Sequence, residues 1–225
     1  MPDTHGGNIF KFSHDQKINL SEVTDFSANI NLLGPSPKGL EALNERLRYI
    51  SHYPDVTNDD VMNTIVDVYG IEKDSILLGN GAAELIYAVG RLSGFTGAFV
   101  PAPGFSEYHA SMDAANIPVR EIFYRQRQND NGTPYFEVPY LALQTFAAEL
   151  KGQDGRIIVF LGNPNNPDGT LLDKQSIKVL AQMLKDANSL LVIDESFIDF
   201  VGNDTLQDNE YSMRSLINEF DNIIV

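Results

Sequence analysis

The sequence contains no cysteine in its 225 residues. This absence excludes disulfides, thiolate metal sites and cysteine nucleophiles together, and it favours a reducing compartment. Long apolar runs are also missing, since no stretch approaches the roughly 20 residues of a membrane span. The first residues lack the basic and apolar regions of a signal peptide. We therefore expect a cytoplasmic protein that has no membrane partner.

Positive charge is scarce. Lysine and arginine number 16 against 31 aspartates and glutamates, which gives a formal net charge of -15. Such a field repels phosphate backbones, and no basic cluster reverses it locally, so nucleic acid is a poor candidate partner. Small anionic ligands remain possible, because backbone N–H groups at helix N-termini bind them whatever the net charge.

What the chain does have is enough apolar sequence, 43%, to bury one large domain or two small ones. Short β-branched runs bounded by turn residues predict strands at 75–78, 98–100, 119–123, 157–161, 190–193 and 222–225. Helical apolar spacing between them predicts helices at 82–92, 106–115 and 174–185. The alternation predicts an α/β fold with a mainly parallel sheet covered on both faces, whose functional residues gather at the carboxyl ends of the strands.

The first 70 residues have a different character. A Gly/Asn/Pro-rich arm extends to residue 37, and helices are expected at about 38–50 and 59–69, separated by a Tyr-Pro break. We expect an N-terminal arm and helical clasp at 1–70, followed by the α/β domain at 71–225. The last four residues have the pattern of a buried strand, and an apolar strand is an unusual place for a domain to end. We therefore expect the domain to be incomplete at residue 225.

The segment 79–84, G-N-G-A-A-E, lies between an expected strand and an expected helix. Its small residues let backbone N–H groups approach an anion at the positive end of the helix dipole, which predicts a phosphate cradle. An ordinary tight turn explains the same residues equally well. A dinucleotide-binding fingerprint fits less well, because Glu84 replaces its third glycine and no acid ends the next strand.

Three further motifs follow predicted strands. In 101–108, P-A-P-G-F-S-E-Y, Phe105 is placed to lie against a ring-shaped ligand, although such a residue is more often part of the core. In 162–169, G-N-P-N-N-P-D-G, three amides lie between prolines that fix the backbone. In 190–195, Asp194 ends a central strand and needs a cationic partner, unless it caps the following turn. A cradle, a ring, an amide and a carboxylate are together what a phosphorylated pyridinium requires.

The order G-N-G, P-G-F-x-E-Y, N-P-N-N-P-x-G, D-E-S-F resembles the fold-type I pyridoxal 5'-phosphate (PLP) enzymes of the aminotransferase superfamily, over nearly the whole chain. The resemblance implies the large domain of that fold, without its small carboxyl-terminal domain. It implies that the backbone of Gly81, Ala82 and Ala83 binds the cofactor phosphate, that Phe105 stacks on the ring, that Asn166 bonds the phenolic oxygen and that Asp194 pairs with the pyridine nitrogen. It also implies a homodimer in which Tyr53 reaches the PLP phosphate of the neighbouring subunit.

Two motifs narrow the resemblance. The segments 5–8, H-G-G-N, and 25–31, D-F-S-A-N-I-N, resemble the opening of the L-threonine O-3-phosphate decarboxylases of cobalamin synthesis. His5 and Gly6 would then match the substrate-phosphate site, with Asn29 and Asn166 as further contacts to a small phosphorylated amino acid. Phe197 agrees with this, because the related histidinol-phosphate aminotransferases usually carry tyrosine there. Such an aminotransferase and a non-catalytic fragment remain the alternatives.

Two features depart from the family pattern. Asp168 stands where the family usually has threonine, which adds a negative charge near an anionic cofactor. The lysine that binds PLP covalently is expected just after Val225, and no lysine follows Lys185. The arginines that bind the substrate carboxylate are expected beyond the same point. We therefore expect the chain as given to bind PLP only reversibly and to turn over nothing.

Overall fold

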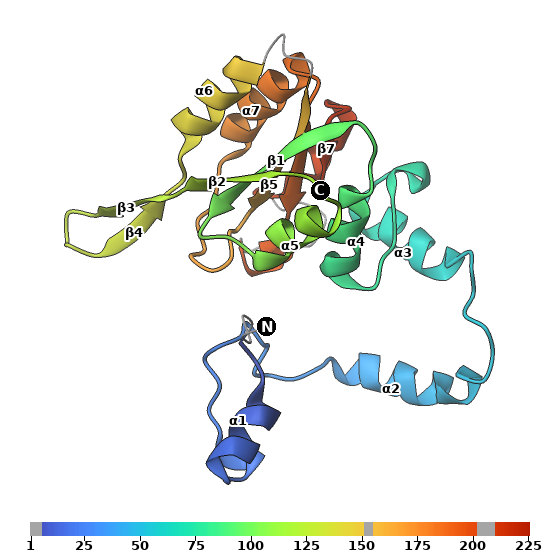
Figure 1. The fold of residues 1–225 in the computed structure, drawn as a ribbon. Helices are drawn as coiled ribbons and strands as arrows, with labels where there is room; N and C mark the ends of the chain where they lie inside the picture. Colours follow the sequence, from blue (N-terminus) through green and yellow to red (C-terminus); the bar gives the residue numbers. More distant parts are fainter. Residues whose placement is uncertain (1–5, 151–154, 202–209) are drawn as a thin grey trace. The chain divides into compact units, whose positions relative to one another are not determined.

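The computed structural model describes residues 6–150, 155–201 and 210–225 (Figure 1). The chain forms two compact units, Met1–Asn58 and Asp59–Val225, which we describe separately. The functional division expected at residue 70 stays a prediction. Among the described residues, no helix has both the length and the apolar character needed to cross a membrane.

The first unit consists of short helices joined by extended chain. Helix α1 (Ile9–Gln16) begins at Asn8, whose side-chain oxygen accepts a hydrogen bond from Lys11 N. Helix α2 (Pro37–Arg46) begins after Ser36 with proline at its first position, where a missing N–H costs nothing. It continues into the 3-10 turn η2 (Leu47–Tyr49), so the helix expected at 38–50 is confirmed. Helix α1 lies in the stretch that we expected to be an irregular arm.

The second unit contains a five-stranded sheet. Its strands are β1 (Phe95–Ala102), β2 (Val119–Phe123), β5 (Arg156–Gly162), β6 (Leu190–Asp194) and β7 (Ile223–Ile224). They are all parallel and lie in the order β2-β1-β5-β6-β7. The parallel sheet predicted from the sequence is confirmed, and the carboxyl ends of its strands form one edge.

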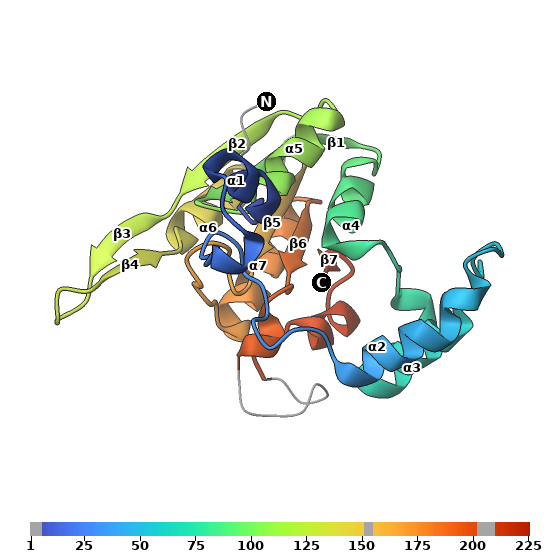
Figure 2. The same cartoon turned by 90° about the horizontal axis from the view of Figure 1, so that it is seen from below.

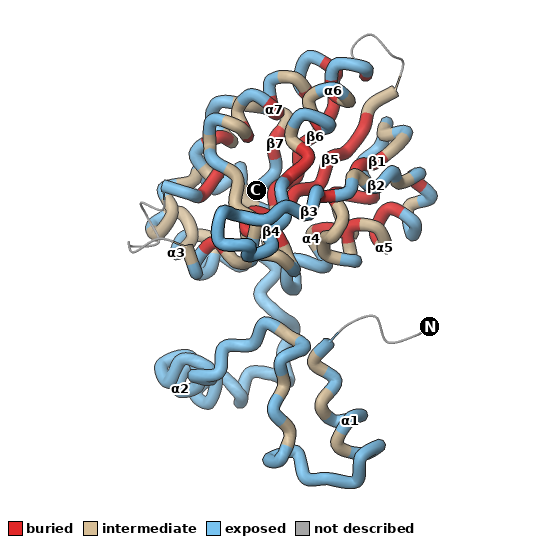
Figure 3. The backbone as a smooth tube through the Cα atoms, turned by 90° about the vertical axis from the view of Figure 1, so that its left-hand side faces the viewer, coloured by how far each residue is buried: buried red, intermediate tan, exposed pale blue. Residues whose placement is uncertain are grey.

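Helices cover both faces of this sheet (Figures 1 and 2). The helices of the second unit are α3 (Asp59–Tyr69), α4 (Gly81–Gly90), α5 (Ser106–Ala114), α6 (Tyr140–Leu150) and α7 (Lys174–Asp186). Successive residues of β5 point to opposite faces. Ile158 and Phe160 pack with α4 and α5, whereas Val159 and Leu161 pack with α6 and α7. The buried runs of the sheet accordingly lie on β1, β5 and β6, whereas no residue of the edge strand β2 is buried (Figure 3).

The strand expected at 75–78 is wrong. The structure has a 3-10 turn, η3 (Lys73–Ser75), followed by extended chain at Ile76 that pairs with no strand in the described part of the molecule. A short apolar run such as Ser-Ile-Leu-Leu needs a partner strand to form a ladder, and no strand of the described residues pairs with it. Its Leu77 is 71% exposed.

In the second unit, a hairpin and a helix were not predicted from the sequence. One is the antiparallel hairpin of β3 (Arg125–Gln128) and β4 (Pro134–Glu137), which extends from the end of β2. The other is α6, whose Leu143, Ala147 and Leu150 are buried against the sheet. Neither alters the carboxyl edge of the sheet.

Candidate functional site

Asp194 ends the central strand β6 and is half-buried. Its Oδ1 accepts hydrogen bonds from Ser196 N at 2.9 Å and Ser196 Oγ at 2.5 Å, and its Oδ2 accepts one from the Tyr108 hydroxyl at 2.8 Å. Among the described residues, no cationic side chain pairs with it. The carboxylate is therefore held in a fixed orientation by neutral donors and remains available for a cationic ligand group.

Tyr108 is a site residue that the sequence did not single out. It lies on α5, is 2% exposed, and stacks on Phe160 with ring centroids 5.1 Å apart. Burial, followed by the charge of Asp194, raises the pKa of the Tyr108 phenol. The hydroxyl is therefore protonated at neutral pH and donates to the carboxylate. Its signal in the sequence is its place at the end of the P-G-F-x-E-Y motif, one helical turn after Phe105, to which no separate role was assigned.

Phe105 immediately precedes α5 and is half-buried. Its ring meets the ring of Tyr108 edge to face, with centroids 5.7 Å apart and planes at 84°. Since Tyr108 also bonds Asp194, one buried tyrosine connects the predicted stacking ring to the predicted carboxylate. The structure thus brings two of the predicted site residues to the same part of the carboxyl edge.

The loop after β5 carries Asn166. Asn163 N at its start donates to Asp194 O at 2.8 Å, which joins this loop to the end of β6. Asn166 is half-buried, and within the described residues its amide makes no hydrogen bond to protein. Asp168 Oδ1 accepts from Asn165 Nδ2 at 2.8 Å and from Thr170 N at 3.1 Å, so the residue that departs from the family pattern closes the loop.

The predicted phosphate cradle lies at the start of α4. Gly81 has φ +80°, a conformation that favours glycine, and its N–H donates to Gly79 O at 2.9 Å. The N–H groups of Ala82 and Ala83 lie in the first turn, where a helix offers no carbonyl partner, and both residues are exposed. The same helix packs through Ile86 against the apolar cluster that contains Tyr108. No direct contact joins Gly81 to Phe105, Asn166 or Asp194 within the described part of the chain.

The remaining predicted residues belong to the first unit. His5 lies outside the described residues. Gly6 permits a close approach, because a Cβ there would lie 1.7 Å from Ser27 O. Asn29 is exposed, and Tyr53 is 99% exposed.

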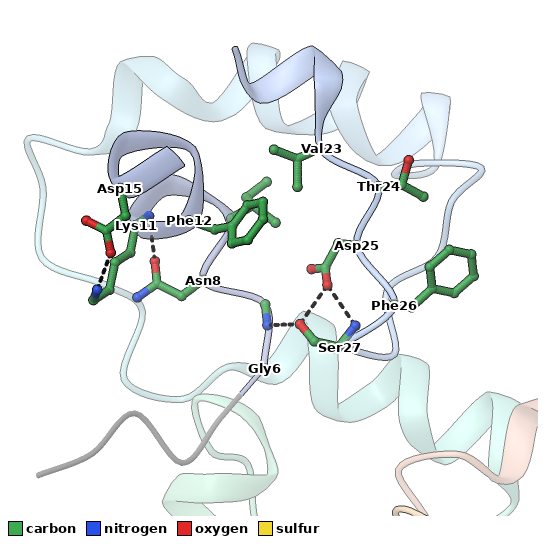
Figure 4. Close-up of a pocket in the computed structure, with 12 residues that line it drawn as sticks. Gly6, Asn8, Lys11, Phe12, Asp15, Val23, Thr24, Asp25, Phe26 and Ser27 are labelled. Carbon is green, nitrogen blue, oxygen red and sulfur yellow. Dashed lines mark hydrogen bonds and ion pairs between the residues drawn. The ribbon is translucent and has the colours of Figure 1, made fainter. Parts of the chain in front are cut away.

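Ser27 connects the two amino-terminal motifs. Its Oγ accepts from Gly7 N at 2.8 Å and donates to Asp25 Oδ1 at 2.6 Å, and its own N–H also donates to that oxygen. The two bonds from Ser27 lower the pKa of the Asp25 carboxyl, and the bond from the hydroxyl contributes more than the bond from the backbone N–H. Figure 4 shows these groups around one pocket, with Asn8 and Lys11 on its other side.

Comparison with known proteins agrees with this geometry. Residues 21–225 match the family model for aminotransferase class I and II. The chain is 36% identical over 203 residues to the adenosylcobalamin biosynthesis bifunctional protein CobDQ of Leptospira interrogans, covering 89% of this chain and 22% of that protein. It is 30% identical over 219 residues to the threonine-phosphate decarboxylase of Salmonella typhimurium, covering 94% of this chain and 57% of that protein.

Among solved structures, the histidinol-phosphate aminotransferase from Clostridium acetobutylicum matches with a TM-score of 0.71 and 25% identity, covering 89% of this chain and 54% of that one. The chain thus spans between about a fifth and somewhat more than half the length of these relatives.

The carboxyl edge fits PLP, the cofactor of this family. Within the described residues, Asp194 has no cationic partner and would suit the pyridine nitrogen, and the Asn166 amide has no protein partner. The two exposed N–H groups at the start of α4 would suit the phosphate. The chain belongs to the class I and II aminotransferases, PLP-dependent enzymes of fold type I.

Proposed function

We propose that the enzyme containing this chain decarboxylates L-threonine O-3-phosphate to aminopropanol phosphate for cobalamin synthesis. The observation that carries the proposal is the Ser27 hydroxyl, which ties Gly7 to Asp25. These residues lie in the two segments, 5–8 and 25–31, that resemble the opening of the threonine-phosphate decarboxylases. Two relatives bear names that agree with this activity.

The residues have separate tasks in this proposal. His5 and Gly6 bind the substrate phosphate, Asn29 makes another contact to the substrate, and Asn166 contacts both cofactor and substrate. Phe105 holds the cofactor ring flat, and Asp194 keeps its nitrogen protonated. The bound cofactor supplies an electron sink for the pair released when a bond at the substrate Cα breaks. The substrate's pose then selects which bond breaks, because the bond perpendicular to the ring is the reactive one.

A histidinol-phosphate aminotransferase is the second candidate, favoured by the fold match at TM-score 0.71. The two activities are separated by assaying the full-length enzyme with threonine phosphate for CO2 release and with histidinol phosphate for amino transfer to 2-oxoglutarate. The proposal expects CO2 release. Efficient amino transfer without CO2 release would overturn it.

We propose further that the enzyme is a cytoplasmic homodimer, in which Tyr53 reaches the cofactor phosphate of the partner subunit. The first unit supports this, because it leaves several large apolar side chains more than 90% exposed: Phe26, Leu33, Tyr53 and Val56. Sedimentation of the full-length enzyme tests the dimer. A Tyr53→Phe variant that binds PLP as tightly as the parent would contradict the role of Tyr53.

A further inference from the structure

The side chain of Asn165 connects two loops at the carboxyl edge of the sheet. Asn165 is 4% exposed, and its Nδ2 donates to Pro103 O at 3.0 Å and to Asp168 Oδ1 at 2.8 Å. Both amide hydrogens are therefore used. Pro103 lies two residues before Phe105, so this amide fixes the loop after β1 to the loop after β5.

The backbone of Asn165 closes its own loop. Its N–H donates to Thr170 O at 2.8 Å, and its carbonyl accepts from Gly169 N at 2.8 Å. Asp168 Oδ1 accepts from Thr170 N at 3.1 Å as well as from the Asn165 amide. Asn166 lies inside this closed loop, so its backbone position depends on bonds made by Asn165 and Asp168.

Burying the Asp168 carboxylate costs free energy, and its hydrogen bonds to the loop offset that cost. Its Oδ2 is buried with no hydrogen-bond partner in the described part of the structure, which is unfavourable for a carboxylate. Only Oδ1 is used, and an amide in place of the carboxylate supplies the same acceptor without the charge.

We propose that Asn165, braced by Asp168, is a positioning residue that sets the separation between the Phe105 ring and the Asn166 amide, and thereby the affinity for a pyridine ring on which Phe105 would stack and whose phenolic oxygen Asn166 would bond. This inference rests on the proposed cofactor site. The residue touches no reacting atom and acts through its two neighbours.

The test is a titration of the whole chain with PLP. Binding is monitored by the circular dichroism signal that PLP acquires when it is bound. Asn165→Ala should weaken PLP binding by about fivefold to tenfold, as expected for the loss of a buried amide's hydrogen bonds. Asp168→Ala should weaken it in the same direction. Asp168→Asn keeps the Oδ1 acceptor and should bind PLP at least as tightly as the wild-type chain.

Asn222 provides a matched control. Its Nδ2 also donates to two backbone carbonyls, Ala181 O at 3.0 Å and Ser189 O at 3.1 Å, but at the amino end of the sheet. Asn222→Ala should lower the free energy of unfolding about as much as Asn165→Ala and leave PLP affinity unchanged. If Asn222→Ala weakens PLP binding equally, the effect is general destabilisation and the inference is wrong.

A double-mutant cycle separates positioning from stability. In a Phe105→Leu background, Asn165→Ala should have less than half of its effect on PLP affinity, because the ring that it positions is gone. An undiminished effect in that background would overturn the inference. If Asn165→Ala leaves PLP affinity unchanged, the inference is wrong and the cofactor site stands. If the wild-type chain does not bind PLP, both the cofactor site and the inference are wrong.

Discussion

Tyr108 and Ser196 together fix the geometry of Asp194, and Tyr108 is the partner that comes from a distant element. Its hydroxyl is the donor to Asp194 Oδ2, and its ring is fixed between Phe105 and Phe160. A donor whose ring is stacked on Phe160 and meets Phe105 edge to face has little freedom to move, so it favours one orientation of the carboxylate. A tyrosine that is 2% exposed thus orients the carboxylate that we propose for the cofactor nitrogen.

Replacing Tyr108 by phenylalanine removes this donor and keeps the ring. We expect the free energy of unfolding to fall by about 1 to 2 kcal/mol and PLP affinity to fall about tenfold, because a carboxylate loses a hydrogen bond. Urea denaturation and PLP titration measure the two effects. Tyr140→Phe is the control. It also removes a tyrosine hydroxyl that donates a hydrogen bond, here from α6 to Ser176 O on α7 at 2.5 Å. Equal PLP affinity in both variants would contradict the role of Tyr108.

Gly81 tests the phosphate cradle. At φ +80° an alanine is strained although no atom lies within 4 Å of its Cβ, so Gly81→Ala should destabilise the fold by about 1 to 2 kcal/mol and weaken PLP binding. Gly132, in the turn between β3 and β4, has φ +76° and equally open surroundings. Gly132→Ala should therefore cost the same stability and leave PLP binding unchanged. Equal PLP affinities for the two variants would exclude the cradle.

The sequence identified site residues where a motif carries them and missed those defined by a distant contact. Asp194 was marked by its place at a strand end. Its Oδ1 caps the following turn through Ser196, which is the alternative that the sequence left open, and its role toward a cofactor stays a prediction. Tyr108 was missed because its partner lies 86 residues away. Asn165 was seen only as one amide of a rigid turn, because its bond to Pro103 depends on how two strands align.

At the scale of elements, Glu195 joins the end of β6 to the turn η5 (Arg214–Asn218). Its Oε1 accepts from Met213 N at 2.5 Å and its Oε2 from Ser212 Oγ at 2.7 Å. Burial raises the pKa of the Glu195 carboxyl, and the bonds from Met213 and Ser212 oppose that shift only in part. The folded state therefore binds this proton more tightly than the unfolded state does.

This shift has a definite sign in the pH dependence of stability. The contribution of Glu195 is fully present below its unfolded pKa of about 4.3 and is lost as pH rises through the higher folded value. Glu195→Gln keeps an acceptor for Met213 and removes the titration. The variant's free energy of unfolding, relative to wild type, should therefore increase from about pH 4 upward and then level off. Urea denaturation across this pH range measures it, and a constant difference would contradict the assignment.

Local sequence patterns predicted most strands of the sheet. They failed where strand formation depends on pairing with another segment. The β-branched run at 75–78 has strand character, but no neighbouring edge pairs with it in the described residues. The strands β3 and β4 are exposed on both faces, so they lack the alternation that marks a strand. Helix α6 did carry a helical apolar spacing at Leu143, Ala147 and Leu150, and that signal was overlooked.

At the scale of the molecule, the lysines of the described chain lie on helices or loops and several are paired with acids. Four ion pairs of this kind are present: Lys11–Asp15, Lys73–Asp59, Lys178–Glu219 and Lys185–Asp221. We expect PLP bound by this chain to remain reversible. Borohydride reduction followed by peptide mass spectrometry should find no stoichiometric lysine adduct. Stoichiometric labelling of one lysine, with CO2 release from threonine phosphate, would show the expectation to be wrong.

The family could be recognised from the sequence because four motifs keep their order along nearly the whole chain. The way these motifs pack could not be predicted from the sequence. The carboxyl edge is assembled from strands β1, β5 and β6 and the loops that follow them, which are far apart in the chain. The choice between decarboxylase and aminotransferase depends on the substrate's pose, which the motifs at 5–8 and 25–31 address only by resemblance.

The most direct test of the account compares PLP binding by the wild-type chain and by Asp194→Asn. The amide keeps the shape of Asp194 and one acceptor oxygen, which can still bond Ser196, while its NH2 group replaces the oxygen that accepts from Tyr108. It also removes the charge that we propose pairs with the pyridine nitrogen. We expect the wild-type chain to bind PLP reversibly and the variant to bind about tenfold or more weakly, since an ion pair to the ring is lost. Equal affinities for PLP, or no binding by the wild-type chain, would contradict the cofactor site at the carboxyl edge.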